Sequence, residues 1–126
     1  MEKPRIIIVD DDRDTRELLA MALETEGFEV SSAANGLRLI SSLQLRRPHL
    51  ILLDVNMSWI DGFELCKAVK KNESFRDIPV IFISGRADPE DKRHGLEVGA
   101  ADYFVKPLDM DKLVNRIREL VPEAAS

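Results

Sequence analysis

Six polar residues each follow an apolar run, and their types could bind a divalent cation and a phosphoryl group. They are Asp10, Asp11, Asp12, Asp54, Ser84 and Lys106. Carboxylates with no neighbouring His or Cys favour a hard cation such as Mg2+, which takes oxygen ligands and phosphate oxygens. Several carboxylates in one place also repel one another unless a cation or protons intervene. We therefore predict a magnesium site in which Asp11 and Asp54 are direct ligands and Asp10 acts through water.

Asp54 is the predicted nucleophile of this set. It directly follows Leu52-Leu53 and begins a loop, so we expect its side chain to stand free at a strand end. A carboxylate that a metal orients and neutralises can attack phosphorus in line, and the product is an acyl phosphate. Lys106 is the predicted counter-ion for this carboxylate and for the phosphoryl oxygens. Ser84 could donate a hydrogen bond to the phosphoryl group and also stabilise the turn at Gly85.

Each of these residues also has a simpler structural explanation. One aspartate of the run 10–12 could cap the helix that follows and interact with its positive end. Asp54 could merely turn the chain, and Lys106 could be an exposed, solubilising side chain. A cap, however, uses one acceptor, whereas here four predicted strands deliver polar residues to one edge of a sheet.

Five apolar runs alternate with segments of helical periodicity, which predicts five βα units. The predicted strands are residues 6–9, 28–33, 50–53, 80–83 and 103–105. Three of these runs are apolar without alternation, as expected for parallel strands that are covered on both faces. Right-handed crossovers then give an open, doubly wound α/β sheet with helices on both sides. Ligands of such sheets bind beyond the carboxyl ends of the strands, where the six polar residues would meet.

The segments between the strands carry apolar residues at helical spacing, which we interpret as core. These residues are Leu18, Leu19, Ala22 and Leu23, then Leu37, Ile40, Leu43 and Leu45, then Phe63, Leu65, Ala68 and Val69. The residues that mark helix ends are Asp88-Pro89 and Asp109 at N-termini, and Gly27, Gly99 and Pro122 at C-termini. Cys66 is interpreted as a core residue, and His49 and His94 as solvated side chains.

The composition indicates one compact globular domain. The chain has 126 residues, 44% of them hydrophobic, and we expect a single domain over residues 1–126. A net charge of −5 argues against direct nucleic-acid contact, which needs clustered Lys and Arg, and favours a basic partner surface. The apolar runs fall far short of the ~20 residues that span a bilayer, and the segment 1–5 is too polar to lead a signal peptide. These features predict a cytoplasmic protein that does not bind a membrane.

Five motifs together resemble the receiver domains of bacterial two-component response regulators, the chemotaxis regulators among them. The motifs are Ile6-Ile7-Ile8-Val9-Asp10-Asp11-Asp12, Leu52-Leu53-Asp54-Val55-Asn56-Met57, Asp61-Gly62-Phe63, Ile83-Ser84-Gly85, and Gly99-Ala100-Ala101-Asp102-Tyr103 with Lys106-Pro107. All occur in the order and spacing of that family, and the resemblance covers a core of about residues 5–121. It implies a flavodoxin-like (βα)5 three-layer sandwich whose five parallel strands have the order 2-1-3-4-5.

The resemblance implies a phosphoacceptor switch in two-component, or phosphorelay, signal transduction. Asp54 would accept a phosphoryl group from a partner histidine kinase or histidine phosphotransfer protein in a Mg2+-dependent reaction, with Mn2+ as an alternative ion. Asp10 and Asp11 would form the acidic pocket, and Asn56 would offer its backbone carbonyl to the metal. The chain would catalyse only its own phosphorylation and dephosphorylation, and would not be an enzyme that acts on other substrates.

The same resemblance implies how the phosphoryl group would act. Lys106 and Ser84 would bind it, the Lys106-Pro107 peptide bond would be cis, and Tyr103 would be a switch residue. A phosphate adds about −1.5 to −2 charges, so drawing Ser84 inward would vacate space into which Tyr103 could rotate. The surface of the fourth helix, fifth strand and fifth helix would respond, control an effector protein or output domain, and support a homodimer. As an alternative, Tyr103 is a fixed, half-buried strand aromatic.

Positions around the predicted pocket raise two further questions. Ser58-Trp59 stands where that family usually has a proline followed by a small residue, so the proline's restriction of φ is missing. Trp59 could shield the site, dock a partner or pack on the third helix. We also expect Asn56 and Arg86, which flank the pocket, to tune how readily water reaches the phosphoryl group.

Two other functions stay open as alternatives. A degenerate receiver would act only as a protein-binding scaffold, without phosphorylation. A Mg2+-dependent phosphatase of the haloacid-dehalogenase type would use Asp10 as the nucleophile, although Asp12 is not followed by the glycine usual in that motif. A flavodoxin-like FMN carrier is disfavoured, because three aspartates would repel the FMN phosphate. The site of phosphate attachment discriminates among these functions.

Overall fold

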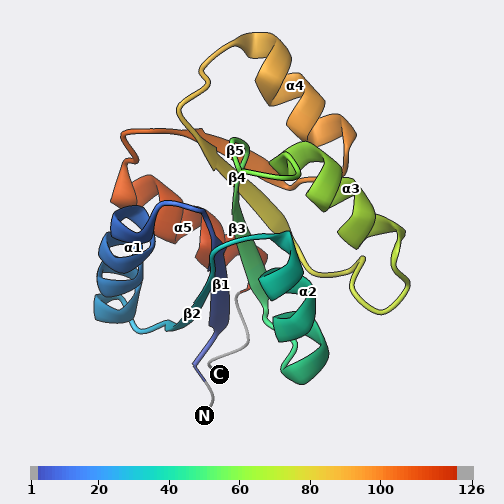
Figure 1. Ribbon diagram of the computed structural model, residues 1–126. Helices are drawn as coiled ribbons and strands as arrows, with labels where there is room; N and C mark the ends of the chain where they lie inside the picture. The colour runs from blue at the N-terminus through green and yellow to red at the C-terminus, as the bar shows by residue number, and fades with distance from the viewer. Residues whose placement is uncertain (1–2, 122–126) are drawn as a thin grey trace.

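The computed structural model describes residues 3–121, in which five strands and five helices alternate along the chain (Figure 1). The strands are β1 (Arg5–Val9), β2 (Glu29–Ala33), β3 (Leu50–Asp54), β4 (Val80–Ser84) and β5 (Asp102–Val105). The helices are α1 (Arg13–Thr25), α2 (Gly36–Leu45), α3 (Gly62–Lys71), α4 (Pro89–Glu97) and α5 (Met110–Leu120). All strand pairs are parallel, and the order β2-β1-β3-β4-β5 confirms the predicted doubly wound sandwich.

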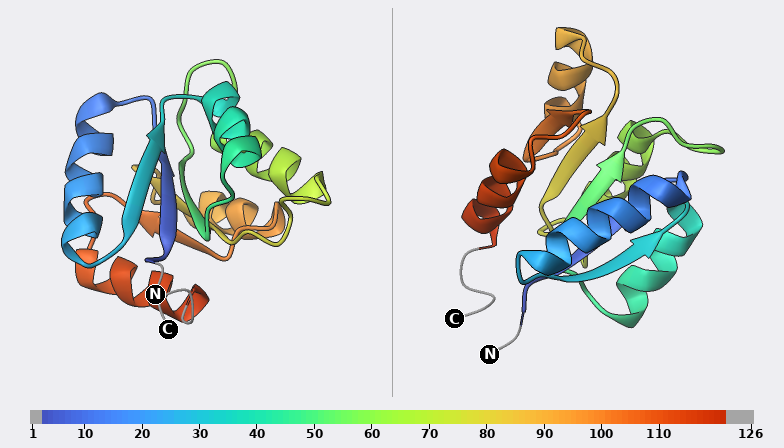
Figure 2. Two further views of the ribbon diagram at one scale, coloured as in Figure 1. Left: turned by 90° about the horizontal axis from the view of Figure 1, so that it is seen from below. Right: turned by 90° about the vertical axis from the view of Figure 1, so that its left-hand side faces the viewer.

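Helices cover both faces of the sheet, with α1 and α5 on one face and α2, α3 and α4 on the other (Figures 1 and 2). Every residue of the central strands β3 and β4 is buried, as their unbroken apolar sequences predict. Each fully buried Leu or Ile side chain contributes about 1.5–3 kcal/mol relative to exposure. The two apolar cores therefore hold the sheet rigidly, and with it the ends of its strands.

Side-chain caps fix where the helices begin. Asp12, Asn35, Asp61 and Asp109 each accept a hydrogen bond from the backbone N–H three residues later. Asp88 precedes α4 without such a bond, and Pro89 supplies the preset φ of the first turn. Gly27 and Gly99 follow α1 and α4 with φ of 96° and 108°, the left-handed conformation predicted for them. The predicted end of the last helix at Pro122 lies outside the described residues.

The predicted core stripes of the helices are too wide. Leu18, Leu37 and Leu45 are 69%, 78% and 87% exposed, and Ala68 is also exposed. A helix that packs on one face of a sheet buries only a narrow arc, so apolar residues at the margins of that arc stay in solvent. Cys66 is fully buried, as predicted.

His49 is not the solvated side chain that the sequence suggested. It is half-buried, and its Nδ1 accepts a hydrogen bond from the backbone N–H of Arg5 at 2.8 Å. This contact ties the start of β3 to the start of β1 at the amino ends of the strands. His94 is exposed as predicted, and its ring lies edge-on to Phe63, with 4.4 Å between the ring centroids.

The strand register brings the carboxyl ends of four strands together. Val9 lies opposite Leu53, Asp54 opposite Ile83, and Ser84 opposite Val105. The residues that follow these positions therefore meet at one edge of the sheet. Within the described residues, no helix is long and apolar enough to cross a membrane.

Candidate functional site

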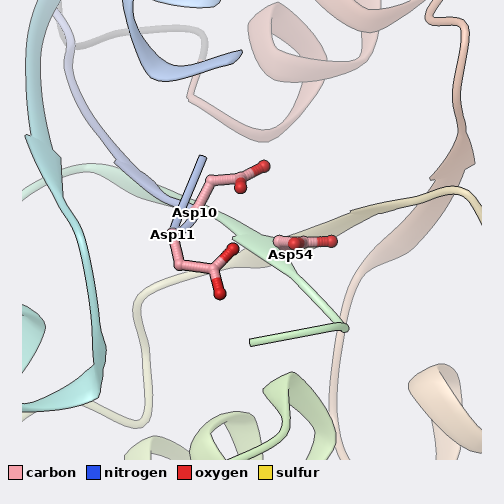
Figure 3. Close-up of side chains that lie close together, drawn as sticks. All are labelled: Asp10, Asp11 and Asp54. Carbon is pink, nitrogen blue, oxygen red and sulfur yellow. The ribbon is translucent and has the colours of Figure 1, made fainter. Parts of the chain in front are cut away.

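Three aspartates from two strands gather at the carboxyl edge of the sheet. Asp10 and Asp11 follow β1, and Asp54 is the last residue of the neighbouring strand β3 (Figure 3). One carboxylate oxygen from each lies within 4.8 Å of the others. Such oxygen donors, with Asp10 and Asp54 buried and Asp11 exposed, suit a hard cation that keeps part of its water shell. The predicted acidic pocket is therefore present in the fold.

Asp10 is held rigidly at the base of this cluster. Its side chain is 1% exposed, and its Oδ1 accepts a hydrogen bond from the backbone N–H of Asp12 at 2.9 Å. Its Oδ2 accepts one from the Lys106 ammonium at 3.1 Å. The backbone oxygen of Asp10 also accepts a hydrogen bond from the Arg16 guanidinium. Each carboxylate oxygen of Asp10 accepts one donor from the protein, so a lone-pair site on each stays open toward a cation or its water.

Asp54 is recessed, and does not stand free as the sequence suggested. Its side chain is only 7% exposed, and the Lys106 ammonium lies 3.8 Å from its Oδ1. Desolvation and then the negative charge of Asp10 raise the pKa of Asp54 to about 6, against the opposing effect of Lys106. At neutral pH the carboxylate is mostly ionised but poorly compensated, so a cation or a further donor would stabilise it.

Gly62, the first residue of α3, packs directly against the backbone at the end of β3. Its N–H donates to the Val55 oxygen at 2.8 Å, which draws the start of α3 against the end of β3. A Cβ at this position would lie 2.8 Å from Val55 Cα and still closer to the backbone oxygen of Asp54. Only glycine allows this approach, so the glycine of the motif 61–63 is explained by packing against the backbone of Asp54 and Val55.

Asp12 has the simpler of its two predicted roles. Its side chain caps α1 by accepting hydrogen bonds from the backbone N–H and hydroxyl of Thr15. The Thr15 hydroxyl is the main cause of a lowered pKa of the Asp12 carboxyl. Asp12 therefore caps α1, whereas Asp10 and Asp11 belong to the acidic cluster.

The loop between β3 and α3 reaches back to the acidic cluster through Ser58. Both the backbone N–H and the hydroxyl of Ser58 donate to Asp11 Oδ2, each at 3.2 Å. The sequence drew attention to Ser58 only because the family usually has proline at this position. It did not predict the contacts with Asp11, although serine, unlike proline, has a backbone N–H that can donate. Trp59 follows with a φ of 78° and is 100% exposed, so it does not pack on α3.

A second set of contacts runs from Ser84 toward α4. Ser84 is fully buried, and its Oγ accepts a hydrogen bond from the Arg86 N–H at 3.0 Å. The Arg86 guanidinium donates to Asn56 Oδ1 at 2.9 Å and lies 3.7 Å from Asp91 on α4. The buried Tyr103 donates its hydroxyl proton to the Arg86 backbone oxygen at 2.9 Å. Arg86 thus contacts the predicted phosphoryl-binding residue Ser84, the second predicted tuning residue Asn56, and the predicted switch residue Tyr103.

Lys106 completes the site from β5. The ammonium that contacts Asp10 and Asp54 belongs to a side chain that is 30% exposed, so it can also meet a ligand from solvent. The peptide bond between Lys106 and Pro107 is cis. Of the residues predicted for the site, Asp10, Asp11, Asp54 and Lys106 are thus gathered at one point, with Ser84, Asn56, Arg86 and Tyr103 connected beside them.

Comparison with known sequences places this arrangement in a family. Residues 6–118 match the response regulator receiver domain. PrrA, a transcriptional regulatory protein of Mycobacterium tuberculosis, is 38% identical over 123 residues, which cover 98% of this chain and 52% of PrrA. PhoB, the phosphate regulon transcriptional regulatory protein of Pseudomonas aeruginosa, is 39% identical over 116 residues, which cover 92% of this chain and 51% of PhoB. The chain thus spans about half the length of these curated relatives.

Solved structures give the same result. The chemotaxis protein CheY4 of Vibrio cholerae superposes with a TM-score of 0.87 at 30% identity, covering 94% of this chain and 99% of that one. The receiver domain of the Francisella response regulator 1452 superposes with a TM-score of 0.88 at 28% identity, covering 95% and 98% of the two chains. Fold and sequence therefore point to the same family.

Proposed function

This chain belongs to the response regulator receiver domain family, and we propose that Asp54 is its phosphoacceptor in two-component signal transduction. The observation that carries the proposal is the charge arrangement around Asp54. Two further carboxylates offer oxygens within 4.8 Å, and the Lys106 ammonium lies 3.8 Å from Asp54 Oδ1. A cation and an ammonium beside a recessed carboxylate favour phosphoryl transfer to it, because both offset the charge that the phosphoryl group brings.

The donor set fits Mg2+. Asp11 and Asp54 would bind the ion directly and Asp10 through water, while the backbone carbonyl of Asn56 would add a neutral oxygen ligand. When bound, the ion neutralises charge on phosphoryl oxygens and favours the ionised form of Asp54. Mn2+ accepts the same kinds of ligand and would substitute.

Asp54 attacks the phosphorus of a phosphohistidine on a histidine kinase or histidine phosphotransfer protein. A phosphorus–oxygen bond forms on Asp54, and the phosphorus–nitrogen bond of the donor breaks. The imidazole leaves with the electron pair and takes up a proton from water. Lys106 and the Ser84 hydroxyl bind the phosphoryl oxygens that arrive, which offsets the negative charge that the group brings into the cluster. The chain thereby catalyses its own modification, and dephosphorylation by water reverses it.

The contacts of Ser84 support a switch at the α4-β5-α5 surface. When Ser84 Oγ turns to the phosphoryl group, it gives up the hydrogen bond from the Arg86 N–H. The Arg86 backbone oxygen that holds the Tyr103 hydroxyl is then free to move, and so is the guanidinium near Asp91 on α4. Reversing a 1:99 population takes about 5.5 kcal/mol of differential binding, which several charge-assisted hydrogen bonds can supply together. That surface would control an effector or output domain, or pair two copies of the chain.

Arg86 and Asn56 would set the lifetime of the phosphoryl group. Their hydrogen bond of 2.9 Å joins the loops that follow β3 and β4, and we infer that it restricts the approach of water to Asp54. Arg86→Met, which keeps bulk but removes the bond, should change the dephosphorylation rate measured after the donor is removed. An unchanged rate would count against this role.

The test is phosphorylation by acetyl phosphate, from which acetate leaves, with and without Mg2+. Intact-mass spectrometry should detect one phosphoryl group on the wild type in Mg2+, little in EDTA, and none on Asp54→Asn. Asp10→Asn removes the same charge from the same cluster and retains Asp54, so it should still take up one phosphoryl group, at a lower level because Asp10 helps to hold the cation. Equal modification of wild type and Asp54→Asn would exclude the assignment.

The same experiment separates the two alternatives. A haloacid-dehalogenase-type phosphatase would carry its phosphate on Asp10, so Asp54→Asn would still be modified and Asp10→Asn would not. A degenerate scaffold would show no acyl phosphate at all. The proposed partners are therefore proteins, and the net charge of −5 disfavours direct contact of this domain with nucleic acid.

A further inference from the structure

Ser58 holds one oxygen of Asp11 with two donors, across 47 positions of sequence. The backbone N–H and the hydroxyl both reach Oδ2 at 3.2 Å, and Asp11 is an exposed residue whose carboxylate would otherwise be mobile. A carboxylate oxygen offers about two lone-pair sites. Two donors therefore occupy Oδ2 and leave Oδ1 for another partner.

We propose that Ser58 is a positioning residue for the cation site: its two hydrogen bonds to Oδ2 fix Asp11 so that Oδ1 faces the cation. This inference rests on the proposed cation site of Asp10, Asp11 and Asp54. Ser58 touches neither the cation nor the phosphoryl group, and it acts only through Asp11.

The need for such a residue follows from the charges. Three carboxylates lie within 4.8 Å of one another, and two of them are buried. Of the three, only the Asp11 side chain could turn into solvent if nothing held it. Repulsion from Asp10 and Asp54 would favour that movement when no cation is bound. Ser58 opposes it, so less conformational freedom is lost when the ion arrives. Partners of this kind, one contact removed from a metal, commonly contribute 10–100-fold to metal affinity.

Proline at position 58 would remove both hydrogen bonds to Asp11. Its ring replaces the N–H, and it carries no hydroxyl, so both donors to Asp11 are lost. Alanine retains the N–H and loses only the hydroxyl, whereas threonine retains both. The three substitutions therefore form a graded series that separates the hydrogen bonds from the bulk and exposure of the loop.

The experiment is calorimetric titration of the full chain with MgCl2, for the wild type, Ser58→Thr, Ser58→Ala and Ser58→Pro. Emission of Trp59, the only tryptophan in the sequence, gives a second binding curve from the adjacent residue. We expect Thr to match the wild type, Ala to bind Mg2+ severalfold more weakly, and Pro to bind on the order of 10-fold more weakly. Thermal unfolding in EDTA identifies any variant that fails to fold, and if Pro does, the Thr and Ala pair decides.

The outcomes separate the positioning role of Ser58 from the cation site itself. Equal Mg2+ affinity in all four proteins would overturn the positioning role and leave the cation site standing. Tighter binding by Ala and Pro would also overturn it, because the hydrogen bonds would then compete with the ion. Weaker binding by Thr, equal to that of Ala, would overturn it too, because Thr keeps both donors and the donors would then not account for the affinity. No Mg2+ binding by the wild type would refute the cation site itself.

Discussion

Replacing Asp54 with asparagine should stabilise the ion-free protein, although it removes the residue proposed to carry the chemistry. Folding raises the pKa of this carboxyl from 3.8 to about 6, mainly through desolvation and the nearby charge of Asp10. A raised pKa means that the folded state holds the proton more tightly than the unfolded state does. Ionisation of Asp54 therefore costs folding free energy, and this cost grows as the pH rises from about 4 to about 6.

The magnitude follows from the size of the shift. Each pKa unit corresponds to about 1.36 kcal/mol, so the roughly two units here amount to about 3 kcal/mol at pH 7.5. At pH 4, where most of the carboxyl is protonated in the folded state and part of it in the unfolded state, the cost falls below about 1 kcal/mol. Asparagine carries no charge, so Asp54→Asn should be more stable than the wild type by about these amounts.

Urea unfolding in EDTA at pH 7.5 and at pH 4 measures both values. Asp88→Asn is the matched control, because Asp88 is exposed, makes no side-chain cap hydrogen bond, and changes by the same single charge. Its effect on the free energy of unfolding should be small at both pH values. The reasoning is refuted if Asp54→Asn is no more stable than the wild type at pH 7.5, or if its advantage does not shrink at pH 4.

Three further perturbations test the parts of the site separately. Lys106→Ala should lower the free energy of unfolding in EDTA by about 1–3 kcal/mol. The loss is smaller than for a fully buried ion pair because the Lys106 side chain is 30% exposed. A loss no greater than that of Lys112→Ala, at an exposed lysine, would contradict the counter-ion role. Gly62→Ala should lower the free energy of unfolding in urea by at least about 1–3 kcal/mol, because its Cβ would meet Val55 Cα at 2.8 Å. Gly85→Ala is the control: its Cβ would meet nothing within 4 Å, so the loss of stability should be far smaller. Mg2+ should change the emission of the fully exposed Trp59, since the neighbouring Ser58 contacts Asp11; a flat titration in a protein that calorimetry shows to bind Mg2+ would mean that the loop does not respond to the ion.

Local features of the fold could be read from the sequence because their partners lie close along the chain. The Asp12 and Asp109 caps each join residues three positions apart, a separation that any helix start imposes. The runs 50–53 and 80–83 predicted central strands, since parallel strands that are buried on both faces are short, unbroken apolar stretches. Parallel pairing then required Asp10, Asp54, Ser84 and Lys106 to share one edge.

Other features depended on contacts between distant loops, which no spacing encodes. Asn56 and Arg86 are 30 positions apart, and Arg5 and His49 are 44 apart; both hydrogen bonds form only because packing sets the paths of the intervening segments. The exposed Leu37 and Leu45 likewise carry the same apolar character as the buried Leu39 and Leu43. How wide an arc each helix buries depends on its neighbours.

The sequence by itself determined the alternation of strands and helices, and hence which side chains meet at the carboxyl edge of the sheet, because a parallel sheet permits no other arrangement of strand ends. Tertiary structure alone decided how those side chains are held. Burial and the charge of Asp10 raised the pKa of Asp54, and the path of the loop after β3 brought Ser58 to Asp11. Burial and loop conformation are properties of the whole packed chain, so residue types and spacing could name the members of the site but not their electrostatic state.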